Sequence, residues 1–100
     1  VQGPVVVLGD FNMSEGSPAY WSMSDVLSDS YLEAGWGLGL TFPHGWSWGP
    51  APIPGPLTRL DYAFHSASLR AEDARVGCQG GSDHCYLCLR LGYAPPHPGR

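Results

Sequence analysis

The sequence predicts an α/β fold, because segments with the pattern of strands stand before and after a segment with the pattern of a helix. Residues 5–8 form a fully apolar, mostly β-branched run that ends at a glycine, which is typical of a strand buried on both faces. Residues 18–27 repeat apolar side chains at helical spacing, behind a serine and a proline suited to the N-cap and the first helical position. Strand patterns return over residues 57–64 and 84–91.

Shorter elements fill the middle of the chain. Ser30 and Glu33 have the spacing of a capping box, which predicts a second, short helix that ends at Gly35. The stretch from Gly35 to Pro56 is rich in Gly, Pro and Trp. Because proline removes an amide donor and fixes φ, this stretch predicts a long loop with only a short strand near residues 40–42.

The last third of the chain is predicted to hold a connection over residues 66–71, a strand over 74–78 and a Gly-Gly-Ser turn at 80–82 before the final strand. We assign residues 1–92 to one portion of a domain and residues 93–100, with three prolines, to a flexible, frayed tail. Because the chain starts almost directly on the apolar run, we expect it to be a fragment.

The composition limits the classes of partner. Nine Asp and Glu residues stand against five Arg and no Lys, which leaves a net charge of -4. Nucleic-acid binders usually carry clustered basic residues, and that footprint is absent from the sequence. No apolar run approaches the roughly 20 residues that span a bilayer, and the start does not resemble a signal peptide. We expect a soluble domain, either cytoplasmic or attached to a membrane through an N-terminal region outside this sequence.

The three cysteines, Cys78, Cys85 and Cys88, are odd in number, so the sequence implies no complete disulfide framework. Cys85 and Cys88 match the C-x-x-C spacing, but they fall in an alternating run typical of a strand. Positions three apart on a strand face opposite sides of the sheet, which argues against a shared zinc site. We therefore interpret the three cysteines as packing residues.

The run Gly9-Asp10-Phe11-Asn12 places a carboxylate and a carboxamide two residues apart at the end of the first strand. Alternation along a strand sends Asp10 and Asn12 to the same side, where one could bind a cation or its water and the other a phosphoryl oxygen. A simple turn is the competing interpretation, because Gly, Asp and Asn are all favoured in turns.

Asp61 lies in a strand segment that is otherwise apolar after Arg59, so its carboxylate needs a partner. Arg59 is one candidate partner, but side chains two apart on an extended strand do not turn toward each other. The dipeptide Asp83-His84 offers another, because a carboxylate on one ring nitrogen fixes the orientation of an imidazole and favours its charged form. His65, at the end of the same strand as Asp61, fits a surface or packing role better than one at the site edge.

Taken in this order, the strand with GDFN, the run RLDY-A-F and the run GSDH resemble the C-terminal signature of the endonuclease/exonuclease/phosphatase family, also called deoxyribonuclease-I-like. The resemblance covers residues 5–91. It implies a four-layer α/β sandwich, two mixed sheets face to face with flanking helices outside. This chain would supply part of that sandwich, with its N-terminal half absent.

The resemblance also implies a role for each polar residue of the signature. Asp10 would orient or deprotonate the attacking water, and Asn12 would hydrogen-bond the phosphate and help to hold Asp10. Asp61 would support His84, which would contact a non-bridging phosphate oxygen. Asp83, together with Asp10, would lie in a metal site for one or two Mg²⁺ or Mn²⁺ ions.

One departure from the family pattern bears on activity. The family's upstream asparagine and its principal metal-binding glutamate belong to an N-terminal half that this sequence does not contain. Glu15 and Glu33 stand in the wrong context to replace that glutamate, and we assign them helix-start and surface roles. The chain alone is therefore expected to bind metal weakly, to turn over slowly or not at all, and to need the upstream half of the same domain.

Trp46 and Trp48 stand two apart between glycines in the long loop. They could stack on a substrate, insert among lipid headgroups or cover the edge of the sheet. We include both as candidate substrate-binding residues. His44, in the same loop, could also meet substrate.

The sequence as a whole favours a divalent-metal-dependent hydrolase of phosphate esters. The substrate could be a small molecule, a lipid-linked ester or a nucleic acid, and the absence of Lys tilts the choice slightly away from nucleic acid. The competing hypothesis is an inactive truncated or non-catalytic binding module of the same fold.

Overall fold

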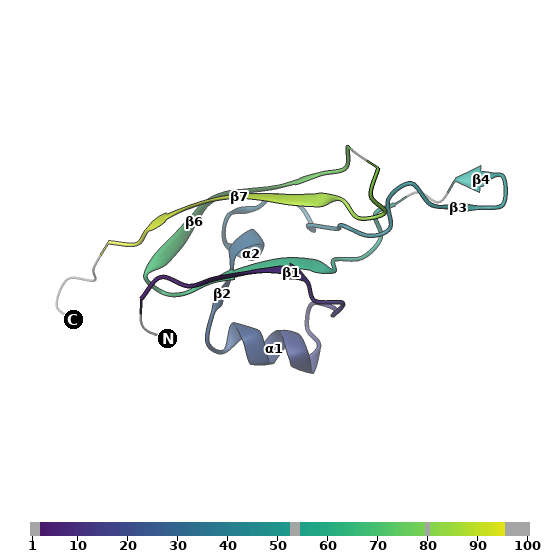
Figure 1. Cartoon of the computed structure of the whole chain (residues 1–100). Helices are drawn as coiled ribbons and strands as arrows, with labels where there is room; N and C mark the ends of the chain where they lie inside the picture. The colour runs from purple at the N-terminus through teal and green to yellow at the C-terminus, as the bar shows by residue number, and fades with distance from the viewer. Residues whose placement is uncertain (1–2, 53–54, 80, 96–100) are drawn as a thin grey trace.

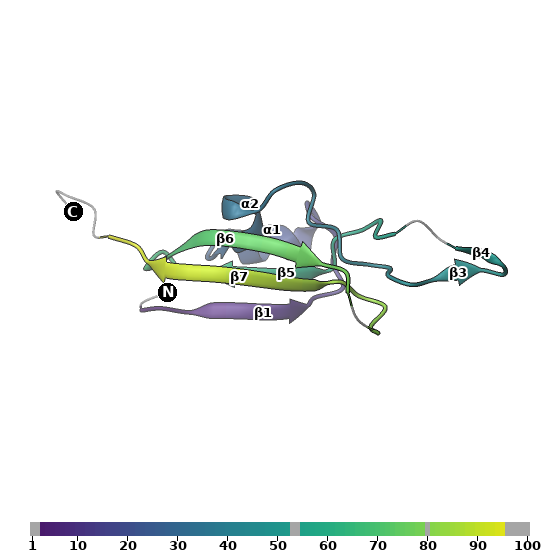
Figure 2. The same ribbon diagram turned by 90° about the horizontal axis from the view of Figure 1, so that it is seen from above.

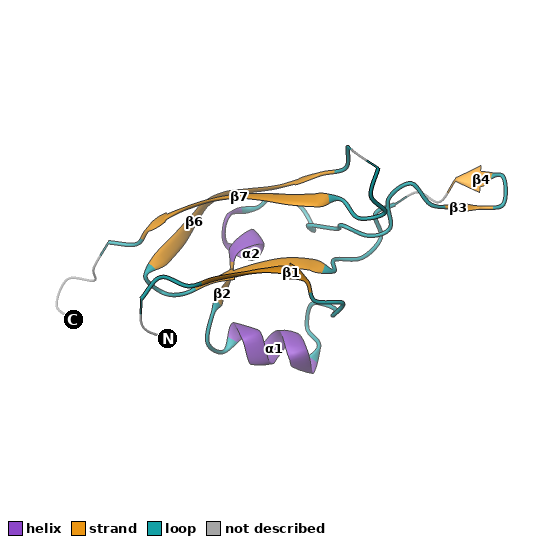
Figure 3. Ribbon diagram, in the orientation of Figure 1, coloured by secondary structure: helices purple, strands orange, loops and turns teal. Residues whose placement is uncertain are grey.

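The computed structural model describes residues 3–52, 55–79 and 81–95. Strands and loops dominate, and both helices are short (Figure 3). In chain order the elements are β1 (Val6–Asp10), α1 (Pro18–Ser24), β2 (Ser28–Asp29), α2 (Ser30–Ala34), β3 (Ser47–Trp48), β4 (Ala51–Pro52), β5 (Asp61–His65), β6 (Leu69–Gly77) and β7 (Tyr86–Tyr93).

The elements are arranged in layers around a three-stranded antiparallel sheet with the order β1-β5-β2. Helix α1 lies on one side of this sheet and the antiparallel hairpin β6–β7 on the other (Figure 1). From above, both strands of the hairpin lie nearly along the line of β1, with β6 pointing the same way as β1 and β7 the opposite way (Figure 2). The small hairpin β3–β4 projects away from the body (Figure 1).

The core lies between the central sheet and α1. Tyr62 and Phe64 of β5 are almost fully buried against Tyr20 of α1, and Leu27 and Met13 complete the cluster. The rings of Tyr20 and Phe64 have centroids 6.0 Å apart, which is within the range of aromatic pairing. Because β5 is central in its sheet, its alternate residues Tyr62 and Phe64 anchor this packing while Asp61 faces the other side.

The α/β class predicted from the sequence is confirmed. Every pairing between named strands is antiparallel, and among the described residues the parallel contact is a single bridge between Gly35 and Ala74. The sheets are therefore less mixed than predicted, and the four-layer sandwich stays a prediction. Neither helix described here has the length or apolar character needed to cross a membrane.

The prediction that the first strand is buried on both faces is wrong. Val6 and Leu8 of β1 are 43% and 63% exposed, whereas Val7 packs against the core cluster. The reason is alternation, since only the face of β1 that carries Val7 is covered by α1. The strand also runs two residues further than predicted, to Asp10.

Both helices differ in detail from the sequence pattern. Helix α1 has the predicted N-cap, Ser17, but ends at Ser24 instead of residue 27, because the chain enters β2 at Ser28 to pair with β5. Helix α2 is capped by Asp29 instead of Ser30, since the carboxylate of Asp29 accepts the backbone N–H groups of residues 31 and 32. Gly35 ends α2 as predicted.

The later strands are displaced from their predicted bounds. β5 begins at Asp61, because the residues before it bond to the loop, with a single bridge between Phe42 and Thr58. The connection predicted over residues 66–71 is only a short turn, since Leu69 already pairs with Tyr93. Gly80 in the predicted turn, residues 53–54 of the long loop and residues 96–100 of the predicted tail lie outside the described residues.

Candidate active site

Two carboxylates of the predicted site meet at the end of the central sheet. β1 and β5 pair antiparallel in a register that sets Asp10 directly opposite Asp61. Directly opposed residues of an antiparallel pair point to the same face. Both carboxylates therefore project toward the side of the hairpin β6–β7, away from α1.

His84 lies between these two carboxylates. Its Nδ1 is 2.7 Å from Oδ2 of Asp61, and its Nε2 is 3.5 Å from Oδ2 of Asp10. Asp61 and His84 are both partly buried, with side chains 20% and 23% exposed. The sequence pattern predicted contact between Asp61 and a residue from elsewhere in the chain, and the structure brings these two together across 23 positions.

The loop that carries His84 is fixed by its neighbours. The backbone N–H of His84 donates to the hydroxyl of Ser82 at 3.1 Å, and its ring packs against Phe42 with centroids 4.7 Å apart. The residue before Phe42, Thr41, contacts the strand of Asp61: its hydroxyl accepts the backbone N–H groups of Leu60 and Asp61 at 3.1 and 3.2 Å. The imidazole and its carboxylate partner are thus positioned by the same short segment of the long loop.

The surroundings of His84 favour its charged form. The hydrogen bond that the imidazole donates to Asp61 raises the pKa of His84 most, against the lowering effect of partial burial. The charges of Asp61, Asp10 and Asp83 raise this pKa further. An imidazolium whose Nδ1–H is held by a carboxylate presents Nε2–H as a donor. That arrangement suits an anionic oxygen and opposes ligation of a cation by the same ring.

Asp61→Asn is expected to lower the pKa of His84, because the substitution removes the largest of the influences that raise it. Folding raises this pKa, so the associated stabilisation is fully present below the ordinary pKa of histidine and is lost as pH rises through the folded value. NMR titration of the His84 ring in both proteins measures the shift directly. An unchanged pKa in the variant would contradict the proposed support of His84 by Asp61.

Arg59 is not available to Asp61, because it is engaged in a buried ion pair. Its guanidinium donates to both carboxylate oxygens of Asp29, at 2.6 and 2.5 Å, and Glu15 approaches it at 3.5 Å. Burial alone would raise the pKa of Asp29, but hydrogen bonds from Arg59 and Tyr20 hold it below its ordinary value. The local interpretation, in which Arg59 is the partner of Asp61, is therefore wrong.

Asn12 lies beside the site, but its backbone does not have the extended conformation of a strand. Its φ is +49°, a left-handed conformation that Asn tolerates better than most residues, so alternation no longer sets the direction of its side chain. Its backbone N–H donates to Oδ1 of Asp10 at 2.9 Å. Asp10 is therefore oriented by the main chain of Asn12, and the exposed carboxamide is free to face a ligand.

Two carboxylates near His84, those of Asp10 and Asp83, are exposed to solvent. Asp10, Asp61 and His84 have donor atoms within 4.8 Å of one another, but the hydrogen bond between Asp61 and His84 explains that proximity better than a metal does. Asp83 is exposed and is not part of this group, although its charge acts on His84.

Trp46 and Trp48 differ in how they are connected to His84. Trp46 packs edge-on against Phe42 with centroids 4.8 Å apart, and Phe42 in turn contacts His84. Trp48, in the projecting hairpin β3–β4, is 81% exposed. A chain of rings therefore links Trp46 to the imidazole of His84, whereas Trp48 has no such connection among the described residues.

Three residues near the site were not predicted to act there: Thr41, Phe42 and Ser82. The contacts of Thr41 and Phe42 join segments distant in sequence, whereas Ser82 bonds to His84 two residues away. His65 is buried and bonded to Ser30 at 2.7 Å, which agrees with the predicted packing role. A groove of about 500 Å³ between α1 and α2 is lined by other residues and does not include His84.

Comparison with known proteins supports the resemblance seen in the sequence. The model of the Endonuclease/Exonuclease/phosphatase family matches residues 2–84, which is most of the chain. Neither curated proteins nor solved structures gave a match. Members of the matching family are phosphoesterase and nuclease-type hydrolases that generally depend on a divalent metal. The chain belongs to the endonuclease/exonuclease/phosphatase family.

Proposed function

We propose that this chain carries the water-activating and charge-stabilising groups of a divalent-metal-dependent phosphoesterase. The observation that supports this most is the array in which His84 stands between Asp61 at 2.7 Å and Asp10 at 3.5 Å. Family membership alone supports hydrolysis of phosphate esters. The array supports a separate role for each of Asp10, Asp61 and His84.

In the proposed reaction, Asp10 orients the attacking water and accepts its proton. Its carboxylate is held by the backbone N–H of Asn12, so one oxygen is directed while the side chain stays exposed. The carboxamide of Asn12 donates to a phosphate oxygen. His84, kept protonated by Asp61, donates from Nε2 to a non-bridging oxygen and stabilises charge as it develops.

The exposed carboxylates of Asp10 and Asp83 fit a hard cation, because Mg²⁺ and Mn²⁺ prefer oxygen ligands. When bound, such an ion offsets the charge of the phosphate. Two carboxylates leave most positions to water and substrate, so we propose that the chain alone binds the ion weakly. The upstream half of the same domain is proposed to add the missing ligand and to cover Val6 and Leu8, which are exposed on β1.

For the substrate, we propose a small or lipid-linked phosphate ester ahead of nucleic acid. The chain has five Arg, no Lys and a net charge of -4, which does not favour a polyanionic backbone. Trp46 stands one ring away from His84 and is proposed to contact the organic part of the ester. Trp48, still more exposed, is proposed to extend that surface.

A metal-dependent assay tests the proposal. The longest reading frame that contains the chain should cleave at least one of four probes with Mg²⁺ or Mn²⁺: a nitrophenyl phosphodiester, a nitrophenyl phosphomonoester, an oligonucleotide and a vesicle containing a lipid phosphate. Chelation of the metal should abolish cleavage. If none of the four is cleaved under any of these conditions, the enzyme proposal fails.

Asp10→Asn should lower turnover on the order of 10²-fold, the size of effect expected when a group acting in the transition state is lost. Asp25→Asn is the matched control, because Asp25 is an exposed carboxylate at the C-cap of α1 and lies outside the site. Equal rates for the two variants would contradict a specific part for Asp10.

A further inference from the structure

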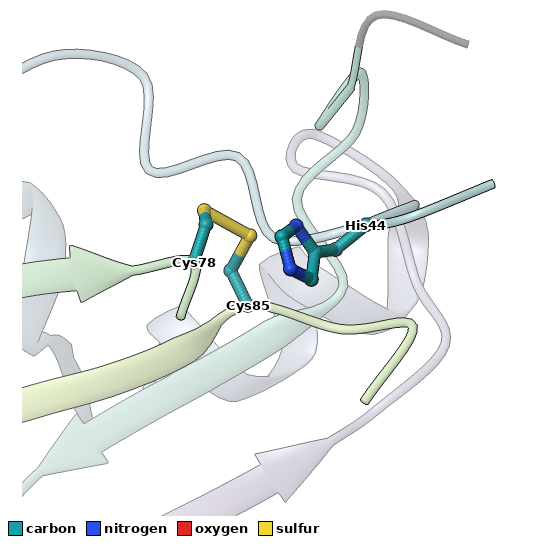
Figure 4. A group of neighbouring side chains, drawn as sticks. All are labelled: His44, Cys78 and Cys85. Carbon is teal, nitrogen blue, oxygen red and sulfur yellow. A yellow bond between two sulfur atoms is a disulfide. The ribbon is translucent and has the colours of Figure 1, made fainter. Parts of the chain in front are cut away.

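A cluster of two cysteines and a histidine, residue types that can bind metals, lies beside the loop that carries His84 and has no part in the proposed hydrolysis. The sulfur atoms of Cys78 and Cys85 and a ring nitrogen of His44 all lie within 4.8 Å of one another. The two sulfurs are joined as a disulfide, and the imidazole of His44 faces them (Figure 4). The prediction that these two cysteines only fill space is therefore wrong.

The fold itself holds the two cysteines opposite each other. β6 and β7 are paired antiparallel up to Gly77 and Tyr86, so the next position on each side is Cys78 and Cys85. Backbone pairing holds β6 and β7 together from Leu69 and Tyr93 to Gly77 and Tyr86, without a part for the disulfide. When the bond is reduced, the hairpin therefore keeps both thiols at its open end.

His44 is held against this pair by backbone hydrogen bonds. The N–H of His44 donates to the carbonyl of Asp83, and the N–H of Cys85 donates to the carbonyl of Thr41, both at 2.6 Å. These two bonds align residues 41–44 with residues 83–85. The imidazole is thus placed by main-chain contacts that are independent of the oxidation state of sulfur.

We propose that reduction of the Cys78–Cys85 disulfide creates a binding site for Zn²⁺ formed by Cys78, Cys85 and His44. Two thiolates and an imidazole are the ligands zinc prefers, and water completes a tetrahedron. Ligands of one tetrahedral zinc stand about 3.8 Å apart, given Zn–S distances of about 2.3 Å. Because the three donor atoms already lie within 4.8 Å of one another, small shifts suffice.

The chemistry balances with a phosphine as reductant. The phosphine and one water convert the disulfide to two thiols, and the phosphine is oxidised to its oxide. Zinc then replaces the two thiol protons, which are released. The ion cross-links the base of the loop that carries His84, in the place where the disulfide does so in an oxidising compartment.

Cys88 is the natural control for this site. It is an exposed free thiol in β7, three positions after Cys85, and it is not part of the group formed by Cys78, Cys85 and His44. The site also differs from the acidic one in the class of ion it takes. Carboxylates favour Mg²⁺ or Mn²⁺, whereas thiolates favour zinc and its spectroscopic substitute Co²⁺.

The test uses Co²⁺ alone as probe, with the chain reduced by a phosphine that is then removed under anaerobic conditions. Reduced protein should bind one Co²⁺ with a thiolate-to-cobalt charge-transfer band, and Zn²⁺ should displace it. The oxidised protein should show no such band. Cys78→Ser should abolish the band, and His44→Ala should weaken binding roughly tenfold or more, since even outer-sphere partners contribute about 10- to 100-fold.

Cys88→Ser should bind Co²⁺ as the unsubstituted chain does. The proposal is overturned if the reduced chain shows no thiolate band, or if the band survives Cys78→Ser. It is equally overturned if the band is lost with Cys88→Ser. Circular dichroism of each variant ensures that a lost band reflects lost ligands, and the oxidised chain provides the same comparison without any substitution.

Discussion

His84→Ala is expected to reduce the turnover of phosphate esters by a factor on the order of 10² or more, because the change removes the donor proposed to stabilise developing charge. Binding of substrate should change less than turnover, since the interaction strengthens in the transition state. Steady-state kinetics with the best of the four probes separates the two effects. A loss confined to KM would contradict this part for His84.

The partnership of Asp61 with His84 is tested by combining two substitutions. Asp61→Asn should lower turnover through the imidazole, so adding it to His84→Ala should cost little more than His84→Ala alone. The contact at 2.7 Å is the reason to expect this coupling. Fully additive losses would show that the two residues act independently.

Arg59→Met is expected to destabilise the fold by about 3–5 kcal/mol, because it leaves the carboxylate of Asp29 buried without its partner. Asp29→Asn should act similarly on the guanidinium. The double variant should lose less than the sum of the two, since neither charge is then stranded. Urea unfolding followed by circular dichroism measures all three free energies.

The pair Arg75 and Asp73 supplies the matched control. Its atoms approach to 3.0 Å, but the side chains are 75% and 38% exposed, so Arg75→Met should cost no more than about 1 kcal/mol. Losses of equal size at the two pairs would contradict the importance of burial at Arg59.

The free energy of unfolding in acid should depend on the same buried pair, Arg59 and Asp29. Folding lowers the pKa of Asp29, so its contribution is present above the ordinary value of 3.8 and is lost as pH falls through the lower folded value. Asp29→Asn should flatten the dependence of unfolding free energy on pH in that acidic window. A slope identical in the two proteins would contradict the assignment.

The polar residues of the site were predictable because they sit in short runs with strong local constraints. A carboxylate such as Asp61 in an apolar strand needs a partner. Strand spacing alone did not exclude Arg59, because Asp73 and Arg75, also two apart on β6, form an ion pair at 3.0 Å. The family resemblance then gave order and roles to Asp10, Asp61 and His84. The α/β class followed from periodicity alone.

What the sequence did not reveal depends on contacts between distant segments. The N-cap of α2 is Asp29, while the hydroxyl of the predicted cap, Ser30, bonds instead to His65 of β5, 35 residues away. The disulfide between Cys78 and Cys85 depends on the register of β6 and β7, which the spacing of the cysteines in the sequence does not reveal. Exposure of Val6 and Leu8 likewise depends on which layers cover β1.

The register that sets Asp10 opposite Asp61 links the proposed catalysis to correct folding. Successive side chains of a strand point to opposite faces, so a slip of one residue between β1 and β5 would turn Asp10 toward α1 and bring Val7 to the open side. A chain misfolded in this way would have no carboxylate across from Asp61. Specific activity would then measure the fraction of molecules in the native strand register, even where secondary-structure content is unchanged.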